Sequence, residues 1–129
     1  MAKPEMEFCD SLPMGQWRKV EGAGEGISEK ILSWDPDTGN LTRLVKFSAG
    51  ASVPNTQVHD FCEEVFVLEG YMLDTAKKIT AAPGYYACRP EGMIHGPYEV
   101  PVSCLCYEVR YQDPAKPLNP DCSLYRMKP

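Results

Sequence analysis

The chain has 129 residues, enough for one domain with a single core, and its 43% hydrophobic and 24% charged residues are ordinary for a soluble globular protein. The formal net charge of −5 and the lack of a basic block argue against nucleic acid or an anionic membrane as a partner, because phosphate binding requires clustered lysine and arginine. The N-terminal residues lack the apolar core of a signal peptide, and no run approaches the roughly 18 apolar residues of a membrane span, so we expect a cytoplasmic protein.

Twelve prolines and ten glycines punctuate the chain, and no long window with a 3.6-residue apolar period is free of them. Helix is therefore expected to be scarce, and a short β-rich run followed by a turn recurs instead. The predicted strands, in chain order, cover residues 41–47, 64–68, 71–74, 78–80, 85–89 and 102–111. Residues 1–26 are expected to form a loop or an edge strand, and residues 112–129 an irregular tail. Strands about ten residues apart predict an all-β sandwich or barrel.

The last predicted strand contains two alternating pairs, Cys104 with Cys106 and Glu108 with Arg110. Side chains two residues apart share a face of a strand, so all four belong to the same face. The charged pair is interpreted as a solvated one on the outside of the barrel, where it would contribute little to stability. The alternative is a buried charge pair beside a cavity.

Six cysteines are present, and disulfides must be weighed because the number is even. The chain is longer than most disulfide scaffolds and shows no export signal, which predicts reduced and mostly buried thiols. No Cys-x-x-Cys pair occurs, which argues against a structural zinc site.

The chain contains only two histidines, His59 and His95. If His59 points into a barrel, alternation places Gln57 and Glu63 on the same inward stripe. His95 follows a turn at residues 90–92, and antiparallel pairing of the two segments can bring it opposite this stripe. The predicted metal ligands are therefore His59, Glu63 and His95, with the side-chain carbonyl oxygen of Gln57 as a fourth.

Two imidazoles and one carboxylate leave coordination positions open for substrate or oxygen. This set suits Fe(II), which we expect first, and it would also hold Mn(II), Ni(II) or Zn(II). A neutral amide oxygen at Gln57 is a weaker ligand than an imidazole, so the hypothesis is that metal affinity is lower than at a three-histidine site.

The chain resembles the cupin family in two motifs, which lie within residues 50–70 and 84–99. The second motif is matched by Gly-x5-Pro-x-Gly-x2-His over residues 84–95. The family's first histidine is replaced by Gln57, and its asparagine after the second motif is replaced by Glu99. The first motif is matched at Gly50, His59, Glu63 and Gly70.

The resemblance implies a jelly-roll antiparallel β-barrel with little helix, formed by one cupin domain over residues 1–129 with its core at about 27–111. It also implies a homodimer with one divalent metal ion inside each barrel, held by His59, Glu63 and His95, and it leaves the role of Gln57 open. The runs Glu-Glu-Val-Phe-Val-Leu-Glu-Gly and Cys-Arg-Pro are similar to those of small dioxygenase-like cupins and of the cupin domain of anti-sigma factors.

Three functions are weighed, because fold membership does not choose a function. The first is an Fe(II) dioxygenase for a small diketone, hydroxyketone or aromatic substrate, in which Glu63 holds the ion and Gln57 orients water or substrate. The second is an isomerase or lyase that uses the metal as a Lewis acid, with Glu99 or a tyrosine such as Tyr98 moving the proton. The third is a non-catalytic module that binds or senses a metal or small molecule. Arg89 and Lys46 are candidates to bind a substrate carboxylate.

Overall fold

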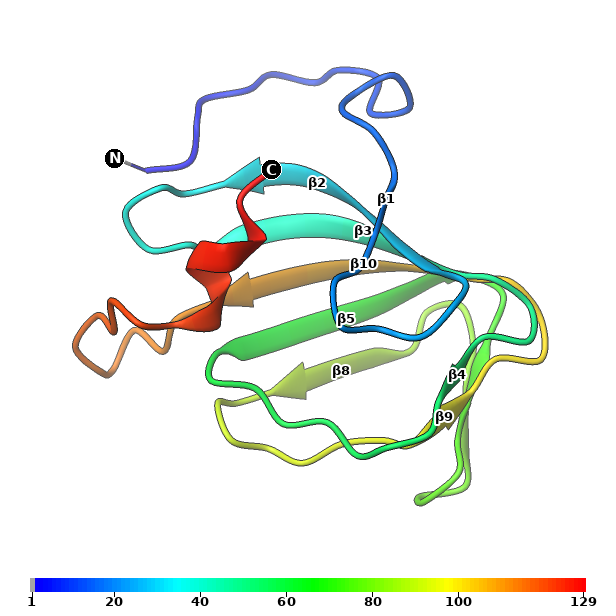
Figure 1. Cartoon of the computed structure of the whole chain (residues 1–129). Helices are drawn as coiled ribbons and strands as arrows, with labels where there is room; N and C mark the ends of the chain where they lie inside the picture. Colours follow the sequence, from blue (N-terminus) through cyan, green and yellow to red (C-terminus); the bar gives the residue numbers. More distant parts are fainter. Residues whose placement is uncertain (1) are drawn as a thin grey trace.

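Two antiparallel sheets face each other in the computed structural model, which describes residues 2–129 (Figure 1). The six-stranded sheet consists, in spatial order, of β1 (Arg18–Lys19), β2 (Ile27–Trp34), β3 (Leu41–Phe47), β10 (Cys104–Tyr111), β5 (Cys62–Glu69) and β8 (Tyr86–Arg89). The four-stranded sheet consists of β4 (Ser52–Val53), β9 (Tyr98–Glu99), β6 (Met72–Asp74) and β7 (Ile79–Ala81). The all-β prediction is confirmed, and the one helical element among the described residues is a 3-10 turn, η1 (Ser123–Met127).

The strand predictions agree with the structure where the sequence is rich in β-branched and aromatic residues. The strand predicted at 41–47 is β3, and the hairpin predicted across residues 71–80 is the β6–β7 pair. The strand β2 was not predicted, because its sequence Ile-Ser-Glu-Lys-Ile-Leu-Ser-Trp lacks clean alternation and carries a register shift between Ile31 and Ser33. The short β4 and β9 were also missed, since two-residue strands leave almost no pattern.

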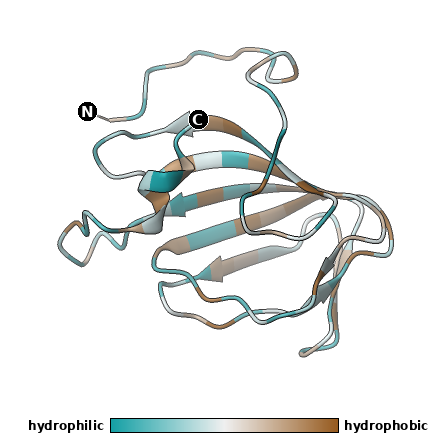
Figure 2. Cartoon of the chain, viewed as in Figure 1, coloured by the Kyte–Doolittle hydropathy of each residue, from teal (hydrophilic) through white to brown (hydrophobic). Residues whose placement is uncertain are grey.

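The space between the sheets holds an apolar cluster that takes its side chains from the inner faces of both sheets. Hydrophobic and hydrophilic residues alternate along the strands of the larger sheet (Figure 2). Val45 on β3, Val65 on β5 and Met72 on β6 are buried members of this cluster. A second cluster, around Leu41 and Leu124, seals the end of the barrel where η1 packs.

The interpretation of Glu108 and Arg110 as an exposed pair was wrong. Both residues are buried, and they share the inner face of β10 with the buried Cys104 and Cys106. Alternation had placed the four side chains on one face, but it does not say which face points inward. The charges can be buried because neighbouring strands supply partners of opposite sign.

The cysteines follow the prediction of mostly buried, reduced thiols. Cys62, Cys104, Cys106 and Cys122 are buried, Cys9 and Cys88 are exposed, and all six are free.

Gly70 ends β5 at a position that admits no side chain. Its φ of +69° lies in the left-handed region, and a Cβ would stand 1.7 Å from the carbonyl oxygen of Ser103. The glycine therefore allows β5 to turn beside the entry to β10.

The N-terminal segment runs over the outer face of the larger sheet, beside β2 and β3 (Figure 1). Lys3 donates to the hydroxyl of Thr42 at 2.8 Å, and Lys30 donates to the carbonyl oxygens of Ser11 and Leu12. Within residues 2–129, no helix has the length and apolar character needed to cross a membrane.

Candidate metal centre

The two histidines are brought together by a single antiparallel bridge. The backbone N–H of Gln57 donates to the carbonyl oxygen of His95 at 2.7 Å, and the N–H of His95 donates back to Gln57 at 3.0 Å. This bridge joins the segment before β5 to the segment after β8, as the alternation and pairing argument predicts. The N–H of Gly92 adds a bond to the carbonyl oxygen of His59 at 3.0 Å, so the turn of the second motif also holds this edge.

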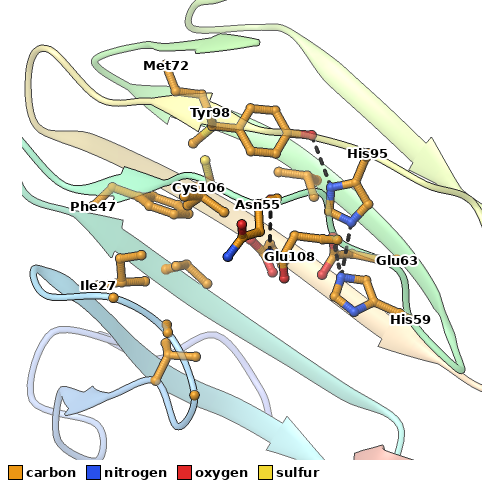
Figure 3. Close-up of a pocket in the computed structure, with 18 of the residues that line it drawn as sticks. Ile27, Phe47, Asn55, His59, Glu63, Met72, His95, Tyr98, Cys106 and Glu108 are labelled. Atoms are coloured by element: carbon orange, nitrogen blue, oxygen red, sulfur yellow. Dashed lines mark hydrogen bonds and ion pairs between the residues drawn. The ribbon is translucent and has the colours of Figure 1, made fainter. Parts of the chain in front are cut away.

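The side chains of His59, Glu63 and His95 converge at one point (Figure 3). The Nε2 atoms of the two imidazoles are 3.1 Å apart, and Nε2 of His59 lies 3.9 Å from Oε1 of Glu63. One ligand atom from each residue lies within 4.8 Å of the others. Phe61 orients the first imidazole, because its ring stacks on that of His59 with centroids 4.6 Å apart.

The carboxylate of Glu63 is held between two guanidinium groups. Nη1 of Arg89 donates to Oε1 at 2.6 Å, and Nε of Arg110 donates to Oε2 at 2.7 Å. Burial by itself would raise the pKa of Glu63, but the charges of Arg110 and Arg89 hold that pKa well below its usual range. Glu63 is thus an anion at any ordinary pH, in a fixed orientation, although it is only 2% exposed.

The pKa of each imidazole is lowered from its ordinary value. Burial, assisted by the positive charge of Arg89, lowers the pKa of His95 to about 4. Burial also lowers the pKa of His59, although the neighbouring Glu63 opposes this effect. A cation can therefore bind at the ring nitrogens near neutral pH without displacing protons from imidazolium.

Tyr98 on β9 connects the second imidazole to Arg89. Its hydroxyl lies 3.1 Å from Nδ1 of His95 and accepts a hydrogen bond from Nη2 of Arg89 at 2.8 Å. Burial raises the pKa of Tyr98, which keeps the phenol protonated. When Nδ1 of His95 carries the ring proton, this N–H donates a hydrogen bond to the Tyr98 oxygen. Nε2 of His95 then has a free lone pair and can act as a metal ligand.

The donor set fits a divalent ion. Two nitrogens at about 2.1 Å from a metal, on adjacent coordination positions, lie about 3 Å apart, which is the separation of the two Nε2 atoms. Each carboxylate oxygen can accept more than one bond, so Oε1 of Glu63 retains capacity for a cation beside Arg89. The two guanidinium groups compete for that charge, and the affinity is expected to be modest.

Of the remaining predicted site residues, one lines the cavity beside this centre and two lie outside the cavity. Gln57 is half-buried and lines the cavity, and its side-chain Nε2 donates to the carbonyl oxygen of Asn55 at 3.2 Å. Glu99 and Lys46 are exposed and do not line the cavity. The catalytic role expected for Glu99 is therefore not supported, because alternation along β9 points Tyr98 inward and Glu99 outward.

A buried charge network behind the centre was missed as a functional feature. Nε and Nη2 of Arg43 donate to Oε1 of Glu108 at 3.1 and 2.8 Å, and Nη1 donates to Glu29 at 3.2 Å. Arg110 links this group to Glu63 and passes over the ring of Phe61 at 4.8 Å. The sequence signal was limited to the alternating charges Glu108 and Arg110 on β10, because β2, β3 and β5 each contribute a single charged residue to the network.

The centre lies at one end of a cavity of about 410 Å³ between the two sheets. The cavity is lined by polar residues near the imidazoles and by apolar residues, including Ile27, Phe47 and Met72, at the other end (Figure 3). The arrangement can bind a small molecule that reaches the imidazoles with a polar group.

The family model of the ChrR cupin-like domain matches residues 11–112. The chain belongs to this cupin family. The cupin resembles a candidate acetylacetone dioxygenase from Methylibium petroleiphilum PM1, with 22% identity over 90% of this chain and 88% of the other, at a TM-score of 0.65. It also resembles an acetylacetone dioxygenase from Acinetobacter johnsonii, with 20% identity over 88% and 89% of the two chains, at a TM-score of 0.59.

A third similar structure is that of Rhodobacter sphaeroides SigE in complex with the anti-sigma ChrR. The cupin matches it with 23% identity over 76% of its own length and 50% of the other chain, at a TM-score of 0.57. No curated protein matches the sequence. At these identities the solved structures establish the fold of this cupin, and its chemistry has to be argued from its own side chains.

Proposed function

We propose that this cupin is a metal-dependent enzyme that holds one divalent ion with His59, Glu63 and His95 and acts on a small substrate that chelates through two oxygens. The observation that carries the proposal is the pair of imidazole Nε2 atoms, 3.1 Å apart beside the carboxylate of Glu63 at one end of a cavity. Such a set would hold a divalent ion and leave coordination positions open for a substrate in the cavity.

Dioxygenation is the favoured reaction, since two histidines and one carboxylate are the donor set typical of Fe(II) oxygenases. Bound Fe(II) would supply open coordination positions and electrons for dioxygen. The similarity in fold to acetylacetone dioxygenases is consistent with a diketone substrate.

The protein residues around the centre bind and orient. Arg89 and Arg110 hold the carboxylate of Glu63 in one orientation, and Tyr98 holds the tautomer of His95. Gln57 lies at the cavity wall, where its amide can orient water or substrate.

A binding or sensing module is the second candidate. It is favoured by the engagement of both carboxylate oxygens of Glu63 by arginine, which leaves that group unsuited to act as a general base. A redox-silent isomerase or lyase would have to use Tyr98 for the proton, since Glu99 lies outside the cavity.

Metal analysis and oxygen consumption test the proposal. Purified protein reconstituted without oxygen should bind close to one equivalent of Fe(II), and His95→Ala should abolish this binding. The matched control is Glu99→Gln, which should bind like the parent, whereas Glu63→Gln should bind much more weakly. Retained metal binding in both His95→Ala and Glu63→Gln would exclude the proposed site.

Oxygen uptake then separates the candidate reactions. The Fe(II) protein with 2,4-pentanedione should consume oxygen in step with loss of the diketone. Turnover of a substrate without oxygen uptake would indicate the isomerase or lyase, and metal binding with no turnover of any tested diketone, hydroxyketone or catechol would favour the binding module.

A further inference from the structure

The cavity is divided into a charged half and an apolar half by the inner faces of the long strands. On β3 the inner residues run from Arg43 to Val45 and Phe47, and on β5 they run from Glu63 to Val65. On the same face of the sheet, β2, β8 and β10 repeat the change from charged to apolar, with Glu29 and Ile27, Arg89 and Ala87, and Glu108 and Cys106, although Glu29 and Ala87 do not line the cavity itself.

The apolar half has no role in holding an ion. Figure 3 shows Ile27, Phe47 and Met72 gathered away from the two imidazoles, with Glu108 between the two groups. The whole cavity measures about 410 Å³, which is room for about 14 water-sized particles at about 30 Å³ each. A diketone with seven non-hydrogen atoms would fill about half of that space and leave the apolar half in contact with water.

The carboxylates of the charged half are already paired with guanidinium groups before any ion enters. Three buried or half-buried arginines and three buried glutamates form one connected group, namely Arg43, Arg89 and Arg110 with Glu29, Glu63 and Glu108, and the partly exposed Arg18 joins this group at Glu29. A divalent ion adds two positive charges to this enclosed group. In a poorly solvated site an excess of charge is costly, so an anionic ligand is favoured over a neutral one of the same shape.

We propose that the ligand of this cavity is a small anion with a bidentate oxygen head directed at the imidazoles and an apolar tail of about four to eight carbon atoms lying against Ile27, Phe47 and Met72. The inference rests on the proposed function, because the head group is assumed to chelate the bound ion. It adds to that function that the head group is an anion and that the ligand carries an apolar tail of the stated length.

The test uses zinc-loaded protein, in which no oxygen chemistry interferes, and isothermal titration calorimetry. The probes are 2,4-pentanedione, 2,4-nonanedione and the neutral 2,4-nonanediol. Each buried methylene should tighten binding about fourfold, so the longer dione should bind on the order of 100-fold more tightly than the shorter one. Binding of either dione as its enolate should release one proton from its central carbon to the buffer, which is measured by repeating the titration in buffers of different ionisation enthalpy.

A loop variant tests the position of the tail. Ala23 lines the cavity and packs against the apolar cluster, so Ala23→Phe should weaken binding of 2,4-nonanedione at least tenfold and leave 2,4-pentanedione within about twofold. The matched control is Ala76→Phe, in an exposed turn outside the cavity, which should bind both diones like the parent.

The failures are distinguishable. If the protein binds no zinc, the proposed metal site and this inference fail together. If zinc binds but the two diones have equal affinity, the tail is refuted while the metal site stands. If zinc binds and 2,4-nonanediol binds as tightly as 2,4-nonanedione, the anionic head is refuted.

Discussion

Replacement of Arg43 by methionine tests whether the buried charge network stabilises the barrel. The Arg43 side chain is 3% exposed, and its guanidinium makes contacts of 2.8 to 3.4 Å with the carboxylates of Glu108 and Glu29. Methionine keeps much of the side-chain volume and removes the charge and all of these hydrogen bonds. Two buried carboxylates would then lose their nearest partner.

The expected cost follows from what remains around those carboxylates. Glu108 retains Arg110 at 3.7 Å, and Glu29 retains the partly exposed Arg18 at 3.9 Å, both too far for a good hydrogen bond. Burial raises the pKa of Glu108, and the charge of Arg43 opposes this effect. Removing one partner of a buried pair costs about 3–5 kcal/mol, a large share of the roughly 5–15 kcal/mol by which a small domain is stable.

Urea unfolding at pH 7, followed by the fluorescence of Trp17 and Trp34, measures this loss. Arg43→Met should lower the free energy of unfolding by about 3–5 kcal/mol. The control Lys46→Met lies on the same strand with its side chain exposed, and it should stay within about 0.5 kcal/mol of the parent.

A double-mutant cycle provides the refutation. Glu108→Gln in the Arg43→Met background removes the stranded charge, so the double variant should be more stable than the sum of the single losses by about 1–3 kcal/mol. A loss below about 1 kcal/mol for Arg43→Met, or strict additivity in the double variant, would show that the network contributes little.

Three further predictions concern the site and its frame. Because the pKa of His95 is lowered from 6.5 to about 4, the folded state binds fewer protons than the unfolded state between these two pH values. The free energy of unfolding should therefore decrease by about 1–2 kcal/mol as the pH falls from 6.5 toward 4. Urea titrations across this range should show a smaller decrease in His95→Gln. Gln57→His adds an imidazole at the cavity wall and should tighten Zn(II) binding at least tenfold in a competition titration; equal or weaker binding would contradict an open ligand position there. Gly70→Ala forces a Cβ against a backbone carbonyl oxygen and should lower the thermal midpoint by more than 10 °C, whereas Gly50→Ala, with a similar φ and open space, should lose much less.

Alternation, turn signals and motif spacing were sufficient to predict the barrel and the meeting of the two imidazoles. The bridge between Gln57 and His95 required only that two short segments pair antiparallel, and the turn before His95 indicated where the pairing begins. These are local properties, since period-two alternation and glycine or proline punctuation act over a few residues.

Only the tertiary structure decided the environment of that centre. The sequence showed that Glu108 and Arg110 share a face, but the face is inward because Arg43 and Glu63 arrive from β3 and β5 to neutralise them. The same packing places Arg89 on the carboxylate of Glu63. These contacts join residues 26 to 65 positions apart, and strand order and register across the whole sheet determine which charges meet.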